Sequence, residues 1–432
     1  MRAEWNERAR SDAFFYVASG RRQQAPDEFF STAELILGMF RSALSRLRTA
    51  NSPKRRALEI GCGPGRLMLP MRESFDEIHG VDVSDQMIAM AKEYLTDTPG
   101  TFPQTCSGSD LAAFPTDHFD YVYSYAVFQH IPSREIVTRY LEEAARVLKP
   151  GGVLCCQLRG VADPASVPTG DHDTWTGCVY PHQDVFPLMR RLGLHLLQIT
   201  GIDTLHMQVV ARKPLDAAPR TIAPGAIVKA ITPTDNPYGL ISPIGPASAF
   251  HCWLEGFPEF ASLDAFDVTL NGAPAVPCYI SDHLGSGGFQ LNVLVPRSTP
   301  YGDTRVEFRW DGHPVERDHV IRISAYPEPT PQIVRVTDGL DLLAKGVSVT
   351  GGLKVLMCGV ADPSAVSFSI GPAVLAVLPP VLYDPYVFGY EFALSLPHSL
   401  TAGLQELTVT AAHWSQTVEF RNLCNRSPES SS

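Results

Sequence analysis

Short apolar runs alternate with amphipathic stretches along the first 213 residues. The apolar runs have the length of buried strands and lie at 56–60, 77–83, 119–125 and 153–157. The amphipathic stretches repeat apolar residues at helical spacing and lie at 66–74, 85–95 and 133–148. Ser84 is suited to cap the second of these helices, and the glycines of Lys149–Gly152 are suited to end the third. Repeated strand–helix units of this length predict a parallel sheet with helices on both faces.

The end of this half follows a different pattern. Pro181–Gly193 has helical spacing, whereas Leu194–Ile199 and Leu205–Ala211 have the composition of strands and are joined only by Thr200–Thr204. A link this short cannot make a parallel crossover, so the two strands must pair antiparallel. The sequence therefore predicts a parallel sheet closed by an antiparallel hairpin.

The second half, from Pro214 onward, lacks helical periodicity and holds 23 of the 36 prolines. Its apolar residues form short alternating runs separated by Pro, Gly, Asn and Asp, such as 289–295 (FQLNVLV), 304–310 (TRVEFRW), 390–396 (YEFALSL) and 406–410 (ELTVT). Alternation with period two over such lengths predicts an all-β sandwich.

This half also repeats itself with a period near 100 residues. Ile227–Asn236 matches Ile333–Leu342 after 106 positions, and Gln290–Gly312 matches Glu391–His413 after 101 positions. Two copies of about seven short strands resemble tandem immunoglobulin-like domains. A single larger jelly roll is the alternative.

Composition and charge narrow the function classes. With 432 residues, of which 44 % are hydrophobic, the chain is long enough for roughly two or three folded domains. The net charge of −11 is concentrated after Pro214, where 12 Lys and Arg face 21 Asp and Glu. We therefore expect no nucleic-acid partner and no binding to an anionic membrane. No window of about 18 apolar residues is present, so no membrane span is expected.

The nine cysteines are scattered and contain no CxxC pair. Such spacing suits neither a zinc site nor a disulfide scaffold, and it is typical of a reducing compartment. The first ten residues also lead into no signal-like apolar block. We expect a cytoplasmic protein without a metal site.

A glycine-rich bend carries the strongest chemical signal. Glu59–Gly65 (EIGCGPG) follows a predicted strand directly, and its three alternate glycines let the backbone approach a ligand closely. Asp82 ends the next strand, 17 residues beyond Gly65, and a carboxylate there can accept both hydroxyls of a ribose. The bend lacks GxGxxG spacing and a P-loop lysine, so the pair predicts a nucleoside ligand without a pyrophosphate. The alternative for the bend is a generic tight turn.

Five segments in succession resemble the motifs of class I S-adenosylmethionine-dependent methyltransferases. They are ALEIGCGPGR, VDVSDQMI, SGSDLAAFP, FDYVYSYAVFQHIP and VLKPGGVL. The resemblance covers about residues 50–213 and includes the closing hairpin. It implies an α/β Rossmann-like methyltransferase domain with S-adenosylmethionine as cofactor. Together with the pattern of the second half, the predicted fold is this domain followed by all-β immunoglobulin-like sandwich domains.

The resemblance also implies a role for particular residues. The residues at the methionine half of the cofactor would be Gly61, Gly63 and Gly65, with Glu59 beneath the bend and the carbonyl of Tyr125 facing the amino group. Asp82 would hold the ribose. At the adenine end, the residues would be Val83, Met87, Asp110 and Leu111. For Val83 and Met87 the alternative is core packing, and for Asp110 it is an ordinary turn.

Methyl transfer from a sulfonium depends mainly on proximity and in-line alignment, and a base is needed only if the acceptor must lose a proton. His130, just after the fourth parallel strand, is the candidate for such a catalytic base, with a packing histidine as the alternative. Asp171–Asp173 resembles a metal cluster, but a solvated loop explains it better. Aromatic residues in 5–16 and 174–180 predict an acceptor pocket that includes Tyr16 and Trp175, with core packing as the alternative.

These observations predict a helical cap at 1–50, a methyltransferase domain at 51–213, β-sandwich domains at 220–326 and 330–422, and a disordered tail at 423–432. The predicted function is methyl transfer to an oxygen or nitrogen atom of a small-molecule or glycan-like acceptor. The alternative is a non-catalytic binding or scaffold protein that retains the fold. Three roles are open for the C-terminal β domains: docking on the methyltransferase domain, self-association, or holding a glycan or protein substrate near the site.

Overall fold

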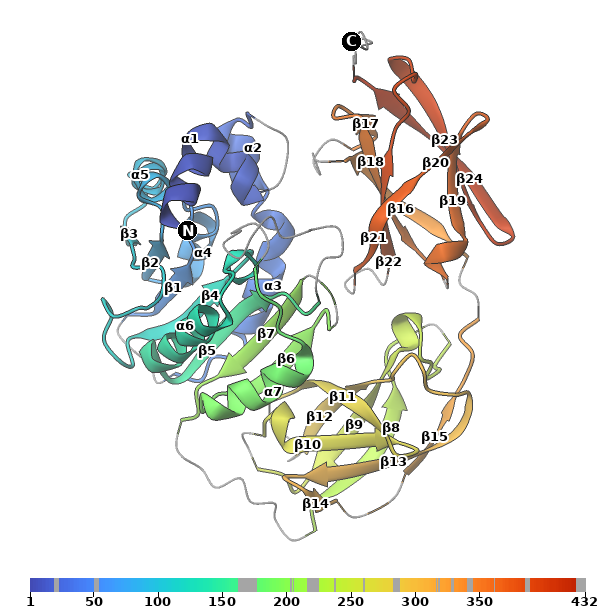
Figure 1. Cartoon of the computed structure of the whole chain (residues 1–432). Coiled ribbons are helices and arrows are strands. Elements are labelled where there is room, and N and C mark those ends of the chain that lie inside the picture. The colour runs from blue at the N-terminus through green and yellow to red at the C-terminus, as the bar shows by residue number, and fades with distance from the viewer. Residues whose placement is uncertain are drawn as a thin grey trace. The chain divides into compact units, whose positions relative to one another are not determined.

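In the computed structural model, the apolar runs of the N-terminal half lie together in one sheet. Its strands are β1 (Arg56–Ile60), β2 (Glu77–Asp82), β3 (Thr101–Thr105), β4 (Phe119–Ser124), β5 (Leu148–Leu158), β6 (His195–Thr200) and β7 (Met207–Arg212). Their order is β3-β2-β1-β4-β5-β7-β6, and the pairs among β1 to β5 are parallel. Strand β7 is antiparallel to both β5 and β6. The predicted parallel sheet closed by an antiparallel hairpin is confirmed (Figure 1).

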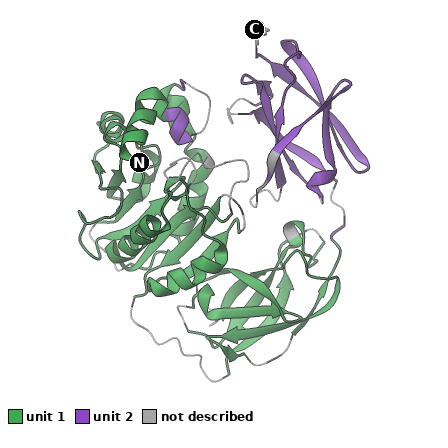
Figure 2. Cartoon of the chain, in the orientation of Figure 1, with its two compact units in different colours: residues 1–13, 25–162, 168–325 green, residues 14–24, 163–167, 326–432 purple. Residues whose placement is uncertain are grey.

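The structure describes the chain except residues 19–22, 50–53, 162–176, 203, 205, 216–224, 237, 259–260, 283–287, 316, 318, 328–329, 340–344, 361, 385–388 and 425–432. The chain is divided into two compact units (Figure 2). The first unit comprises residues 1–13, 25–162 and 168–325, and the second comprises residues 14–24, 163–167 and 326–432. None of the described helices combines the length and apolar character that a membrane crossing requires.

Helices pack on both faces of the sheet. On one face are α3 (Glu34–Leu44), α4 (Met68–Met71) and α5 (Asp85–Tyr94), and on the other are α6 (Arg134–Val147) and α7 (His182–Arg191). Helices α1 (Arg2–Ala18) and α2 (Pro26–Ser31) precede them in the chain. The side chains of Ser84 and Ser133 accept from backbone N–H groups in the first turns of α5 and α6, so each serine is an N-cap. Because side chains alternate along β4, Tyr121 packs with Phe40 of α3 and Val122 packs with Leu141 of α6.

Strand β5 begins earlier than predicted. Helix α6 ends at Val147, and β5 starts at Leu148 instead of Val153. The strand register shifts between these positions, because Phe119 pairs with Leu148 whereas Tyr121 pairs with Val153. The intervening Lys149–Gly152 segment therefore forms a bulge in the strand, as well as ending the helix.

The rest of the first unit is all β. Its strands are β8 (Ile227–Pro233), β9 (Ala249–Glu255), β10 (Phe266–Leu270), β11 (Ala273–Ile280), β12 (Gly288–Leu294), β13 (Gly302–Trp310), β14 (His313–Pro314) and β15 (His319–Ile323). Strand β11 pairs with β10 through its first residues and with β12 through its last residues. Large apolar side chains fill the interior, among them Phe250, Phe289, Phe308 and Trp310. We call residues 225–325 the first sandwich.

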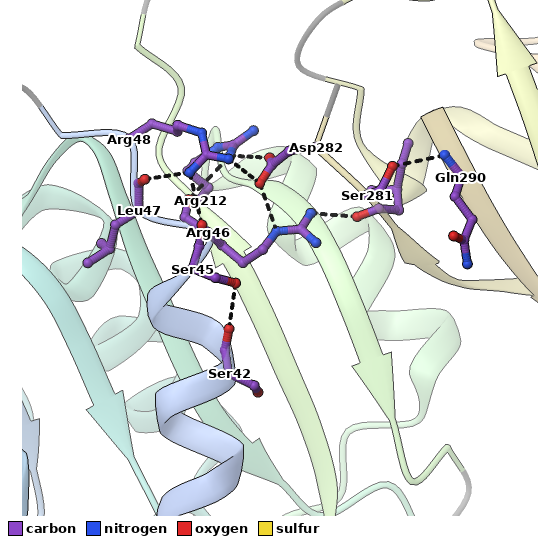
Figure 3. Close-up of polar contacts among 10 residues, drawn as sticks. Ser42, Ser45, Arg46, Leu47, Arg48, Arg212, Ser281, Asp282 and Gln290 are labelled. Carbon is purple, nitrogen blue, oxygen red and sulfur yellow. Dashed lines mark hydrogen bonds and ion pairs between the residues drawn. The ribbon is translucent and has the colours of Figure 1, made fainter. Parts of the chain in front are cut away.

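The first sandwich is joined directly to the N-terminal sheet. Tyr279 of β11 pairs antiparallel with Gln198 of β6, so the two sheets share an edge. Beside this edge, Asp282 forms ion pairs with Arg46, Arg48 and Arg212 (Figure 3). The guanidinium of Arg46 also donates to the carbonyl of Ile280 and lies 5.3 Å from the centroid of the Tyr279 ring.

The second unit contains a further two-sheet sandwich. One sheet has the order β16-β18-β22-β21, from Gln332–Asp338, Gly352–Cys358, Gly389–Ser395 and Val377–Asp384. The other has the order β17-β24-β23-β19-β20, from Val347–Ser348, Trp414–Asn422, Gly403–Ala411, Val366–Ile370 and Ala373–Leu375. Val355 and Phe392 of the first sheet pack in one core with Phe368 and Leu407 of the second. The all-β class of the C-terminal region is confirmed, and its immunoglobulin-like character stays a prediction.

Candidate functional site

The glycine-rich bend follows β1 at the carboxyl edge of the parallel sheet. Gly61 and Cys62 donate backbone hydrogen bonds to the carbonyl of Val81 on β2, at 2.7 and 3.1 Å. The φ angles of Gly61 and Gly65 are +74° and +88°, a region that L side chains rarely adopt. A Cβ on Gly61 would also lie 2.2 Å from Cγ2 of Val127. Sterics thus require glycine in this bend.

Asp82 lies directly against the bend. Its Oδ2 accepts from the backbone N–H of Gly63 at 3.0 Å, and its Oδ1 accepts from the N–H of Ser84 at 2.8 Å. Burial raises the pKa of Asp82, and these N–H donors oppose that shift. The juxtaposition of bend and carboxylate is the geometry that the sequence predicted, and each oxygen retains a lone pair that a ribose hydroxyl can use.

Glu59 lies beneath the bend in a closed environment. Its side chain is buried, and Tyr123 donates a hydrogen bond to Oε2 at 3.0 Å. Burial raises the pKa of Glu59 from 4.5 to about 8. Arg66, which directly follows the bend, is also buried and donates to the Thr32 hydroxyl at 2.9 Å. Its Nε has no hydrogen-bond partner among the described residues, so this end of the bend favours an anionic group.

At the predicted adenine end, Val83 is partly buried and Met87 is fully buried. Asp110 accepts from the N–H of Ala112, as a turn residue does. The backbone N–H of Leu111 donates to Glu143 at 3.2 Å, and its carbonyl accepts from Arg146 at 3.1 Å. Both backbone groups of Leu111 are therefore engaged by α6, and the cofactor contacts predicted for these positions stay predictions.

The first turns of α1 touch three of the loops at this edge. Arg2 donates to the carbonyl of Cys106 after β3 at 2.7 Å. The side-chain oxygen of Asn6 accepts from the Ser84 hydroxyl after β2 at 2.7 Å. Trp5 packs edge-to-face on His130 after β4, with ring centroids 5.4 Å apart. Helix α1 thus packs against the edge that carries the glycine bend.

Comparison with known proteins agrees with this geometry. Residues 58–156, which contain the bend, Asp82 and His130, match a methyltransferase domain family. The N-terminal domain is a class I S-adenosylmethionine-dependent methyltransferase domain. S-adenosylmethionine is the cofactor of this family.

Curated relatives of the methyltransferase domain include a ubiquinone biosynthesis O-methyltransferase of Cereibacter sphaeroides, which is 28 % identical over 161 residues. That match covers 34 % of this chain and 63 % of the relative. An uncharacterized methyltransferase of Schizosaccharomyces pombe is 27 % identical over 153 residues, covering 32 % of this chain and 49 % of the relative. The chain therefore spans less than two thirds of the length of these relatives.

Solved structures similar to the chain include the magnesium protoporphyrin IX methyltransferase of Synechocystis with bound SAH, at 14 % identity and a TM-score of 0.36. It covers 49 % of this chain and 97 % of that chain. The geranyl diphosphate C-methyltransferase of Streptomyces coelicolor has 14 % identity and a TM-score of 0.35, with 49 % and 96 % covered.

Two of the predicted site residues, Tyr125 and His130, follow β4. Tyr125 follows this strand, and its ring packs edge-on against Phe40 at 6.2 Å. His130 lies in a short 3₁₀ turn and is buried. Its Nε2 is 3.2 Å from the side-chain nitrogen of Gln129, which in turn contacts Gln157 of β5. The structure therefore surrounds His130 with polar groups that the sequence analysis did not single out.

The two predicted acceptor residues have different outcomes. Tyr16 lies near the end of α1, in the segment 14–24 that belongs to the second unit, and packs edge-on against Phe15 at 5.2 Å. Trp175 and the Asp171–Asp173 cluster lie outside the described residues. Sequence reasoning missed Asn6 and Gln157, since neither belongs to a recognisable motif. The predicted helical cap at 1–50, which contains Asn6, was the one signal that pointed toward its position.

Proposed function

We propose that the chain binds S-adenosylmethionine and transfers its methyl group to an oxygen atom of a small-molecule acceptor. The observation that carries this proposal is the hydrogen bond from the N–H of Gly63 to Asp82, which brings the side-chain-free bend and the carboxylate together. This arrangement suits S-adenosylmethionine. The backbone of the glycine bend lets the methionine part of the cofactor approach closely, and the Asp82 carboxylate can accept hydrogen bonds from the ribose hydroxyls. Similarity to O-methyltransferases supports oxygen ahead of nitrogen as the accepting atom.

The residues of the bend would bind and orient the cofactor. Gly61, Gly63 and Gly65 would contact its methionine part, and the buried guanidinium of Arg66 would attract the carboxylate of that part. Asp82 would hold the ribose. The cofactor supplies an activated methyl group, so the protein contributes chiefly proximity and alignment. We place the acceptor beside His130 and the first turns of α1.

Binding of S-adenosylhomocysteine to the 432-residue chain, measured by calorimetry and by thermal shift, tests the cofactor site. The expected result is saturable binding with one site per chain. A panel of hydroxylated aromatic, carboxylate and sugar-containing acceptors, incubated with labelled S-adenosylmethionine, then tests methyl transfer. Absence of binding would favour the alternative of a scaffold protein that retains the fold. Binding without transfer to any member of the panel would contradict transfer to an oxygen atom and would favour a nitrogen acceptor.

Two further properties are proposed, a reducing compartment and self-association. All nine cysteines are free, which suits a reducing compartment such as the cytoplasm. Alkylation of the denatured protein immediately on isolation, followed by mass spectrometry, would count nine alkylated cysteines if this is correct. The acidic β domains are proposed to mediate self-association, and sedimentation of the full chain across a concentration series tests it. A constant sedimentation coefficient would exclude self-association in that range.

A further inference from the structure

A chain of polar side chains runs across the carboxyl ends of β4 and β5 to the start of β7. Its centre is Gln157, which is 3 % exposed. The side-chain oxygen of Gln157 accepts from the backbone N–H of Ala126 at 3.0 Å. Its side-chain nitrogen lies 2.9 Å from Oε1 of Gln129 and 2.9 Å from Nδ1 of His206. Gln129 in turn places its nitrogen 3.2 Å from Nε2 of His130.

The orientation of both amides follows from one backbone group. The N–H of Ala126 can only donate, so the atom of Gln157 that faces it must be the oxygen. The amide nitrogen of Gln157 then faces Gln129, which must present its own oxygen in return. If Gln129 were turned over, two N–H donors would oppose each other in a buried site. Gln129 therefore directs its nitrogen toward His130.

The same logic determines where the imidazole proton lies. An amide nitrogen has no lone pair to offer, so Nε2 of His130 must accept from Gln129. A ring that accepts at Nε2 is neutral and carries its proton on Nδ1. By the same argument, Nδ1 of His206 accepts from Gln157, and the proton of that ring lies on Nε2.

The backbone around His130 is held from a second direction. The N–H of Gly177 donates to the carbonyl of Gln129 at 2.7 Å, and the N–H of Cys178 donates to the carbonyl of Ile131 at 3.0 Å. A Cβ on Gly177 would lie 2.3 Å from that carbonyl of Gln129. Backbone bonds therefore hold the turn that carries His130, whereas the side-chain network determines its tautomer.

The geometry points to Gln157 as a positioning residue for methyl transfer, which, through Gln129, holds His130 as a neutral ring protonated on Nδ1. This inference rests on the proposed function for its catalytic meaning. The Nε2 lone pair of His130 is used inside the protein, so this nitrogen does not take a proton from the acceptor. In the transfer, a lone pair of the acceptor oxygen forms the bond to the methyl carbon, the carbon–sulfur bond breaks, and its electron pair stays on sulfur. The favoured acceptors are therefore those whose oxygen is already ionised, such as carboxylates and acidic phenols.

The decisive variant is Gln157→Glu, which is nearly isosteric. Glutamate can accept from Ala126 with one oxygen, but it cannot donate to Gln129 or His206. Gln129 must then turn its nitrogen toward position 157 and its oxygen toward His130. The structure therefore predicts that this variant moves the proton of His130 from Nδ1 to Nε2. Gln104→Leu is a matched control, because Gln104 is a partly buried glutamine of β3 outside this network.

Long-range proton–nitrogen correlation spectra of the 432-residue chain, labelled with ¹⁵N-histidine, report the tautomer without cofactor or acceptor. The His130 signal is assigned by its loss in His130→Gln. The expected result is an Nδ1–H ring in the wild type and in Gln104→Leu, and an Nε2–H ring in Gln157→Glu. An Nε2–H ring in the wild type would overturn the inference, and so would an unchanged tautomer in Gln157→Glu.

A kinetic measurement separates this inference from the proposed function. With an acceptor found in the panel, Gln157→Glu should lower kcat/KM on the order of 10- to 100-fold while the affinity for S-adenosylhomocysteine changes less than about twofold. If Gln157→Glu weakened cofactor binding as much as it lowered kcat/KM, a role of Gln157 on the acceptor side would be contradicted. If no S-adenosylhomocysteine binds even to the wild type, the proposed function fails, and the spectra still decide the tautomer.

Discussion

The guanidinium of Arg212, at the end of β7, donates to the carboxylate of Asp282 in the first sandwich at 2.7 Å (Figure 3). Arg46 and Arg48, which follow α3, approach the other oxygen of the same carboxylate at 3.4 and 2.5 Å. The side chains of Arg212 and Arg46 are only 3 % and 8 % exposed. The Asp282 carboxylate of the first sandwich therefore neutralises the buried guanidinium groups of Arg46 and Arg212.

Loss of this carboxylate should destabilise the first unit. Asp282→Asn leaves the charges of Arg46 and Arg212 buried without an anion, and the expected cost is about 3 kcal/mol in the free energy of unfolding. Urea unfolding of the full chain measures it. Asp303→Asn is the control, since the pair of Asp303 with Arg322 is exposed and should contribute less than about 1 kcal/mol. Equal effects of the two variants would contradict the role of Asp282.

Asp82 should dominate the affinity for the cofactor. Asp82→Ala removes the acceptor proposed for the ribose and also the partner of the Gly63 N–H. Hydrogen bonds to a charged group contribute about 1.5–3 kcal/mol, so binding of S-adenosylhomocysteine should weaken on the order of 10- to 100-fold. Calorimetry measures this loss. Asp97→Ala, at an exposed position of the same domain, should leave the affinity unchanged, and a retained affinity in Asp82→Ala would remove the ribose assignment.

The requirement for glycine at position 61 has two parts, the positive φ angle of the backbone and the crowding by a neighbouring side chain. Gly61 and Gly193 have similar positive φ angles, +74° and +69°, but only Gly61 is crowded, by the side chain of Val127. Alanine at Gly193 should cost about 1–2 kcal/mol for the backbone alone. Alanine at Gly61 should cost about 1–3 kcal/mol more because of the clash.

The double variant Gly61→Ala/Val127→Ala tests the clash directly. It should recover most of the additional cost in urea unfolding, because the two Cγ atoms nearest the new Cβ are gone. Strict additivity of the two single effects would show that the crowding does not matter.

Glu59 should make stability depend on pH above neutrality as well as below it. Its folded pKa of about 8 exceeds the ordinary 4.5, so the folded protein holds a proton that the unfolded chain releases between these values. The contribution of Glu59 to stability is therefore present in full below about pH 4.5 and is lost as the pH rises toward 8. Glu59→Gln should flatten the decline in unfolding free energy across this range.

Glu77 provides a control of opposite sign. Hydrogen bonds from Lys54 and Arg56 lower the pKa of Glu77 to about 2, so its contribution to stability is lost only as the pH falls from 4.5 toward 2. Glu77→Gln should flatten the acid side of the profile and leave the range from 4.5 to 8 unchanged. A Glu59→Gln profile parallel to that of the wild type would show that Glu59 is ionised in the folded protein.

Much of the fold could be predicted from local pattern. The strands at 56–60 and 119–125 are apolar runs whose burial follows from their composition, and Ser84 and Ser133 cap their helices as their positions indicate. The hairpin of β6 and β7 followed from the shortness of its link. The bulge at Lys149–Gly152 was missed. A Pro-Gly-Gly segment interrupts the regular backbone hydrogen bonds of a helix and of a strand alike, so the sequence does not distinguish the end of a helix from a bulge in a strand.

The sequence by itself determined the glycine bend and Asp82 as a pair, since parallel neighbours β1 and β2 must bring their carboxyl ends to one edge. Only the tertiary structure decided that Asp282 meets Arg46, 236 positions away, and that Gln157 lies between Gln129 and His206. Periodicity states which side of an element is buried, but it does not state which polar side chain of a distant segment will satisfy a buried charge or amide. That choice follows from the packing of complete elements, so it is made only when the whole chain is folded.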